Sequence, residues 1–184
     1  MALLGRHRRE PLPEEAKRAL GLHAHEKVLA WSSLTGHGYA VATPEGLRIL
    51  TPRGVVVRRA WTDVYRAAWE ADSGALAILW VGSRQPTPLE IEDPSRLPDV
   101  VHQRVTNSVV LATEVVVPGG RRVWIALRKA QDGTLLTQAV PPPGVSLDDP
   151  PVAAVIRRAL QALREEAGGQ DGDGACGVPP AIGL

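Results

Sequence analysis

Histidine and carboxylate side chains that can bind a divalent metal gather just before the first predicted strand. His23, His25 and Glu26 fall in the segment HAHEK, and His37 follows in a predicted turn. Their spacing does not match the regular spacing of zinc-binding motifs. We therefore expect a solvated entry to the sheet here, and we predict no metal ligand and no cofactor for the chain.

Residues suited to acid–base or nucleophilic catalysis are present, but their positions do not form a catalytic constellation. A catalytic serine needs a base and an orienting group beside it, and no serine of the chain lies in a GxSxG context. Glu90 and Glu92 lie on the outward face of a predicted strand, and Asp148 and Asp149 precede a predicted helix. Neither pair indicates a general acid with its general base. The sequence therefore predicts a protein that is not an enzyme.

Phosphate-binding loops and nucleic-acid recognition are not indicated either. The segments VPGGRR and DGDGACG lack the strand–loop–helix order of a Walker or Rossmann motif. The formal net charge is only +1, so no strong field steers the chain towards a nucleic acid. Cys176 is the single cysteine, and no window reaches the roughly 18 uninterrupted apolar residues of a membrane helix. We expect a cytoplasmic protein with no specific nucleic-acid partner.

Basic residues are the feature that points to a binding surface. One stretch with few acids contains Arg96, Arg104, Arg121, Arg122, Arg128 and Lys129. Within it, Arg121, Arg122, Trp124 and Arg128 are candidate contacts for a protein partner or, more weakly, for an anionic membrane surface. Arginines also solvate strand edges, where their charge discourages edge pairing. Trp124 alternates away from its apolar neighbours, so it either packs under a helix or is exposed as a candidate hot spot.

The elements that carry these residues begin with a run of strands. Period-two alternation predicts strands at residues 27–34, 39–43, 46–50, 55–61, 64–70, 75–81 and 88–93. The spacing is typical of an antiparallel sandwich or a partly open barrel. Because the chain contains no Phe, we expect Trp61, Trp69 and Trp80 to pack in the core. The polar step Thr62-Asp63 is expected to turn the chain at a strand corner.

The second half of the chain alternates between helical and strand patterns. Apolar residues at steps of four predict a helix over 98–112, although NSVVLATEVVV also fits a strand from Val109 onward. Gly-Gly and Asp-Gly turns predict two hairpins after it. Pro150 begins an amphipathic helix that ends near Gly168. This part either extends the same sheet or forms a subdomain.

These patterns predict an α+β fold, with a bent antiparallel sheet and two amphipathic helices. We expect one compact unit over 13–167, with its core at 27–112 and a second meander with the C-terminal helix at 113–167. Residues 1–12 are expected to be a flexible basic N-terminus, and residues 168–184 a disordered tail. The sequence contains no indication of the oligomeric state.

The run VATPEGLRIL…VVVRRAWTDVYRAAWEADSGALAILW resembles the first strands of bacterial PH-like (pleckstrin-homology superfold) and GRAM-like domains. In those domains a "tT..gL.l" strand pair leads to a "pW.di..v" corner and a short polar turn. The matching positions are Thr43, Gly46, Leu47, Trp61 and Val64. The resemblance covers residues 27–112, and the chain is similar as a whole to PH-like proteins of high-GC bacteria. It implies a bent sheet sandwich closed at one end by a helix, with no invariant catalytic motif.

Together these features predict a non-enzymatic binding or interaction module that docks a protein partner or an anionic surface. The alternative is a small-ligand carrier or an enzyme with a site in the mouth of the sheet. A carrier would need a continuous apolar cavity of at least a few hundred Å³ lined by Trp and Val.

Overall fold

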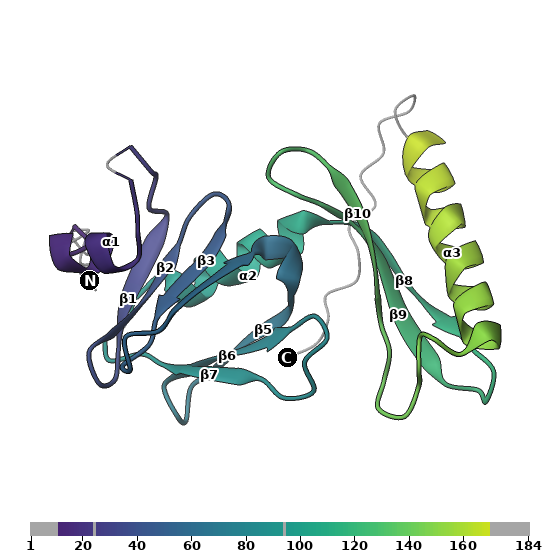
Figure 1. The fold of residues 1–184 in the computed structure, drawn as a ribbon, viewed down its shortest axis with the longest axis horizontal. Helices are drawn as coiled ribbons and strands as arrows, with labels where there is room; N and C mark the ends of the chain where they lie inside the picture. The colour runs from purple at the N-terminus through teal and green to yellow at the C-terminus, as the bar shows by residue number, and fades with distance from the viewer. Residues whose placement is uncertain (1–10, 24, 94, 170–184) are drawn as a thin grey trace, which may run out of the picture.

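The computed structural model describes residues 11–169 except residues 24 and 94. Within these residues the fold is α+β, with three antiparallel sheets that are not closed into a barrel and three α-helices (Figure 1). The predicted flexible N-terminus at 1–12 and the predicted disordered tail at 168–184 lie almost entirely outside the described residues. None of the helices in the described part of the chain is both long and apolar enough to cross a membrane.

Residues 11–108 form what we call the N-terminal lobe, whose strands make two sheets. The first sheet has the order β1-β2-β3-β4, with bounds Ala30–Leu34, Gly38–Ala42, Gly46–Leu50 and Val56–Ala60. The second sheet has the order β5-β6-β7, with bounds Val64–Glu70, Ala75–Trp80 and Thr87–Glu90. The seven predicted strands are confirmed, with small shifts at their ends.

A single 3-10 turn, η1 (Trp61–Asp63), leads the chain from the first sheet into the second. The indole N–H of Trp61 donates to the carbonyl oxygens of Thr43 and Pro44, at 3.0 and 3.1 Å. These carbonyls belong to the turn between β2 and β3. The predicted strand corner is therefore confirmed, and its tryptophan ties it to a neighbouring turn.

The β2–β3 turn has the sequence TPEG because each end of it is sterically or chemically constrained. The backbone N–H of Gly46 donates to the Thr43 hydroxyl at 3.2 Å, which closes the turn. A Cβ atom added to Gly46 would lie 2.0 Å from the carbonyl oxygen of Arg59 on β4. Only glycine allows the backbones of β3 and β4 to approach this closely.

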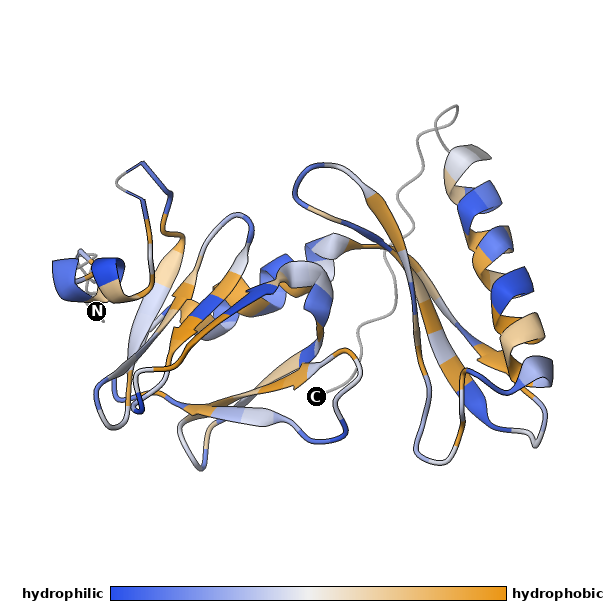
Figure 2. Ribbon diagram, viewed as in Figure 1, coloured by the Kyte–Doolittle hydropathy of each residue, from blue (hydrophilic) through white to orange (hydrophobic). Residues whose placement is uncertain are grey.

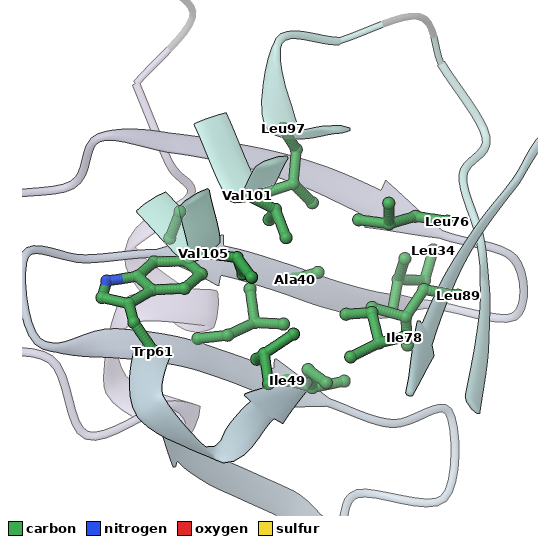
Figure 3. Packing of buried hydrophobic residues seen from close by; sticks show 13 residues of the cluster. Leu34, Ala40, Ile49, Trp61, Leu76, Ile78, Leu89, Leu97, Val101 and Val105 are labelled. Carbon is green, nitrogen blue, oxygen red and sulfur yellow. The ribbon is translucent and has the colours of Figure 1, made fainter. Parts of the chain in front are cut away.

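One apolar core lies between the two sheets of the N-terminal lobe (Figure 3). Helix α2 (Leu97–Ser108) covers it with Leu97, Val101 and Val105, which recur at every fourth position and are buried. Trp61 closes the core beside the end of α2, with 6% of its surface exposed. The helical period predicted from these residues is confirmed.

The predicted extent of this helix, 98–112, is wrong at its C-terminal end. The helix ends at Ser108, and Val109 has the extended φ and ψ angles of −84° and 118°. From Val109 the chain pairs with a neighbouring strand, as the alternative strand reading predicted. Val109 and Val110 are both β-branched, which favours a strand. Together with the hydrogen bonds to the neighbouring strand, this outweighs the helical preference of apolar residues at steps of four.

Residues 109–169 form the C-terminal lobe, which has its own sheet and helix. Strands β8 (Val109–Val116), β9 (Arg122–Lys129) and β10 (Leu135–Val140) make the third sheet in the order β10-β9-β8. Helix α3 (Pro150–Gly169) packs its apolar residues on one face of this sheet, and hydrophilic bands run along the rest of the helix (Figure 2). The two predicted hairpins are confirmed, and this part forms a separate sheet.

The outer face of the first sheet is covered by the short helix α1 (Glu14–Ala19), which packs on Val41. Arg48 of β3 donates from Nη1 to the carbonyl oxygen of Gly21 at 2.9 Å and forms an ion pair with Glu26. The arginine thereby binds the chain that leaves α1 to the sheet.

The three tryptophans expected in the core differ in their burial. Trp61 is buried, as predicted, and Trp80 is half-buried, with its indole N–H donating to the Thr87 hydroxyl at 2.9 Å. The prediction is wrong for Trp69, whose surface is 47% exposed. It lies near the end of β5, and β5 is an edge strand of the second sheet.

Candidate functional site

The four residues predicted as a contact surface lie on or beside β9, but they do not come together. Arg121 and Arg122 are exposed at the β8–β9 turn, where Nη1 of Arg122 lies 3.3 Å from a carboxylate oxygen of Glu114. Trp124 is half-buried further along the strand. Arg128, near the opposite end of the strand, is fully buried. The structure therefore forms no common basic patch at these positions.

Arg128 instead joins the two lobes. Its guanidinium donates to the carbonyl oxygens of Trp61, Thr62 and Val64 at 2.9, 3.2 and 2.6 Å. These three carbonyls belong to the corner between the first two sheets. Nε of Arg128 also lies 3.1 Å from the Ser108 hydroxyl, at the end of α2. One side chain thus fixes β9 both to the corner and to the helix.

A second side chain of the third sheet reaches the same corner. Nε2 of Gln138 on β10 donates to the Thr62 carbonyl at 2.6 Å, and its Oε1 accepts from Arg128 at 3.3 Å. Within the described residues, every buried side-chain nitrogen and oxygen has a hydrogen-bond partner. The junction is therefore a satisfied polar network, which favours one defined arrangement of the two lobes.

The Arg128 charge is held by neutral oxygens. Its acceptors are carbonyl, hydroxyl and amide oxygens, including the Val105 carbonyl in the last turn of α2, where the helix dipole is negative. Burial lowers the pKa of Arg128 to about 10, and the nearby Asp63 opposes this shift. The group stays protonated at neutral pH. Arginine suits the position because its planar fork carries five donors.

Trp124 also connects the lobes, through a ring contact. Its ring lies edge-on to Tyr65 of β5, with the centroids 5.1 Å apart. Burial raises the pKa of Tyr65; the charge of Arg66 opposes the shift and that of Glu114 adds to it. Of the two readings left open for Trp124, neither fits: the ring is half-buried against a strand of the other lobe.

We expect Trp124→Ala to lower the pKa of Tyr65 towards its ordinary value of about 10, because the ring that excludes water is removed. The raised native pKa means that the neutral phenol is favoured in the folded state. The contribution of the Tyr65 phenol to stability is present below the pKa that it has in the unfolded chain. It is lost as the pH rises through its pKa in the folded protein. Tyrosinate absorbance, titrated in a Tyr39→Phe background, measures the shift. An unchanged titration would show that Trp124 does not desolvate Tyr65.

A hollow of about 210 Å³, which we call the junction pocket, opens where the two lobes meet. Its wall comes from the β2–β3 turn, the η1 corner, the last turns of α2 and the β9–β10 turn. In Figure 1 the β9–β10 hairpin extends over the end of α2. The polar side chains in the lining are those of Glu45, Thr62, Arg104, Asn107, Ser108, Lys129 and Gln131.

A second hollow, which we call the α3–β10 groove, has a volume of about 470 Å³. It lies between α3, the edge strand β10 and the loop that joins them. Its lining residues are Thr137, Leu147, Ala153, Ile156, Arg157, Leu160, Gln161 and Arg164. The lining therefore combines apolar side chains with two cations and contains no carboxylate.

The backbone of β10 borders this groove as an edge strand. Within the described residues, β10 pairs with β9 alone. The backbone N–H of Ala130 donates to the Thr134 carbonyl at 2.8 Å, which makes this the first hydrogen-bonded pair of the hairpin. Because hydrogen-bonded and non-hydrogen-bonded pairs alternate, the N–H and C=O groups of Leu135, Thr137 and Ala139 point away from β9. The groove thus has a row of backbone donors and acceptors along one side.

The two histidines of the HAHEK segment lie side by side in the structure. The rings of His23 and His25 stack with centroids 5.7 Å apart, and the backbone N–H of His23 faces the Glu26 carboxylate at 3.4 Å. No group of three or more His, Cys, Asp or Glu side chains that could hold a metal ion occurs in the described ranges.

The sequence predicts some of the charged residues that line these two hollows as binding residues, and not others. Arg104 and Lys129 belong to the basic stretch, but they lie on separate elements that only the tertiary fold brings to one pocket. Arg157 and Arg164 lie seven positions apart on the predicted C-terminal helix, which places them on one face. That spacing is a signal in the sequence itself, whereas the apolar stripe predicts only the helix.

Comparison of the chain with protein-family models, with curated proteins and with solved structures gives no match. The functional argument therefore rests on the geometry of the junction pocket and of the α3–β10 groove.

Proposed function

We propose that the protein is a non-enzymatic interaction module that docks an extended segment of a protein partner in the α3–β10 groove. We also propose that residues 27–112 have a PH-like fold. A four-stranded and a three-stranded antiparallel sheet share one core, and a helix follows them to cover it, which supports this assignment. The third sheet and α3 are then an addition to that fold, and the groove lies in the addition.

The observation that carries the proposal is the combination of an open sheet edge with an adjoining groove. An extended peptide can add a strand to such an edge, with main-chain hydrogen bonds for affinity and side-chain pockets for specificity. Natural proteins usually protect an edge with charges or proline. β10 instead has exposed Leu135 and Leu136, at 48% and 39% of their surface.

The chemistry of the groove specifies the occupant. Leu147, Ile156 and Leu160 present an apolar floor, and Arg157 and Arg164 lie beside it. A strand places every second side chain on the same face. The occupant is therefore a peptide segment with a bulky apolar residue and an acidic residue two positions away, both directed into the groove.

Selection of random peptides on the full chain tests this function. We expect enrichment of segments with the apolar and acidic spacing described above, and we expect the double substitution Arg157→Gln with Arg164→Gln to weaken their binding by about tenfold or more. Fluorescence anisotropy of a selected peptide measures the affinity. Failure to enrich any segment, or equal affinity for the double variant, would contradict the proposal.

A proline substitution tests the backbone part of the contact. Thr137→Pro removes an outward N–H and leaves the ladder to β9 intact, because proline is tolerated on edge strands. It also removes the hydroxyl that accepts from Arg164 at 3.3 Å, and Thr137→Ala, which keeps the N–H, controls for that loss. Ala112→Pro is the matched control, since Ala112 lies on β8, the opposite edge of the same sheet. We expect only Thr137→Pro to abolish peptide binding. Equal losses in the two variants would show that the peptide does not pair with β10.

A further inference from the structure

We propose that the junction pocket binds a small phosphate-class oxyanion, either as a free phosphate ester or as the headgroup of a lipid. The pocket lies at the meeting point of the two lobes and is distinct from the α3–β10 groove. Its volume of about 210 Å³ is below the roughly 300–1,000 Å³ of sites for drug-sized ligands. A ligand of a few heavy atoms, or one group of a larger molecule, fits that size.

Four of the side chains in the lining carry donors that are not engaged by the protein itself. Within the described residues, the side chains of Arg104, Asn107, Lys129 and Gln131 make neither a hydrogen bond nor an ion pair. In the part of the chain that the structure describes, Lys17, Arg48 and Arg122 form ion pairs with carboxylates, and Arg104 and Lys129 do not. Two cations and two amides that face one hollow present charge-assisted donors to an anion, and the fork of an arginine matches phosphate oxygens.

Arg128 makes the wall behind the pocket favourable to negative charge. The carbonyl oxygens of Trp61, Thr62 and Val105 would otherwise direct the negative ends of their dipoles towards this region, and each accepts a hydrogen bond from Arg128. The guanidinium contacts no carboxylate among the described residues. Asp63 lies near enough to raise the pKa of Arg128, so its negative charge offsets part of the positive field that Arg128 adds to the pocket.

One acidic residue, Glu45, also lines the pocket and opposes an anion there. Its side chain is exposed, as is that of Lys129, so solvent screens both charges. Substitution of Glu45 should therefore change the affinity for an anion in the opposite direction to substitution of a cation. Glu45→Gln should tighten the binding of an anion, whereas removal of a cation should weaken it.

Isothermal titration of the full chain with inorganic phosphate and, separately, with glycerol 3-phosphate tests the site. We expect saturable binding of at least one probe that weakens about tenfold in Arg104→Gln and in Lys129→Gln. Glu45→Gln should bind more tightly. Arg53→Gln, in the exposed β3–β4 turn and in the lining of neither hollow, is the matched control and should bind as the wild type does. No saturable binding of either probe, or wild-type affinity in both Arg104→Gln and Lys129→Gln, would overturn the proposal.

Vesicles that contain phosphatidic acid, compared with neutral vesicles, identify the source of the anion. Co-sedimentation that Arg104→Gln abolishes assigns the site to a lipid headgroup, and both soluble probes should then compete with the vesicles. With soluble binding present and no co-sedimentation, the ligand is a free phosphate ester. Vesicle binding that persists in Arg104→Gln, with no response to the soluble probes, would overturn the proposal.

Discussion

Arg128→Met is expected to lower the free energy of unfolding by about 3–5 kcal/mol, because it removes one donor group from several buried acceptors at once. The substitution also removes the cost of burying a charge, which works in the opposite direction. We expect the loss to exceed that gain, since three carbonyls of the corner, the Ser108 hydroxyl and the Gln138 amide oxygen all lose a donor.

Urea denaturation followed by tryptophan fluorescence and by circular dichroism measures this effect. The wild type should unfold in one transition over the proposed unit 13–167, because the two lobes share the Arg128 contacts. Arg122→Met is the matched control: the residue is exposed and its ion pair is at the surface, so its loss should be within about 1 kcal/mol. If Arg128→Met were as stable as the wild type, the junction would not depend on this charge.

Trp61→Ala is expected to destabilise the protein by about 3–5 kcal/mol, as for other large-to-small substitutions of a buried aromatic residue. The indole fills one end of the core between the two sheets (Figure 3). The substitution also removes the donor to the Thr43 and Pro44 carbonyls. The loss therefore combines a cavity with two carbonyls that no longer receive a hydrogen bond from the corner.

Trp69→Ala makes the same substitution at an exposed tryptophan of β5, and the two losses of stability can be compared. Its ring is about half exposed, so we expect a loss of less than about 1.5 kcal/mol in the same denaturation experiment. Equal losses for the two tryptophans would contradict the assignment of Trp61 to the core and Trp69 to the surface.

The strands and turns were predictable because their signals are local. Gly-Gly and Asp-Gly turns fix the two hairpins, and Thr43, Gly46 and Trp61 are the residues that the β2–β3 turn and the corner require. The extent of α2 was not predictable in the same way. Apolar steps of four continue past Ser108, and only the pairing of Val109 with β9 decides that the helix ends there.

The binding surfaces were harder to predict, because they depend on which elements meet. Arg121, Arg122 and Arg128 look alike in the sequence, yet the first two are exposed and the third is buried between the lobes. The sequence around Arg128 does not indicate which carbonyl oxygens accept its hydrogen bonds. Those of Trp61, Thr62 and Val64 lie more than sixty positions earlier in the chain. Charge alone therefore could not separate a surface contact from an internal anchor.

The most direct test of the proposed function is amide hydrogen exchange of the full chain with and without a selected peptide. Binding along β10 predicts slower exchange at the outward amides of Leu135, Thr137 and Ala139. The opposite edge of the sheet, at Ala112 and Val116, should exchange as before. Protection at β8 with no change at β10, or no change at either edge, would contradict the docking of a partner strand in the α3–β10 groove.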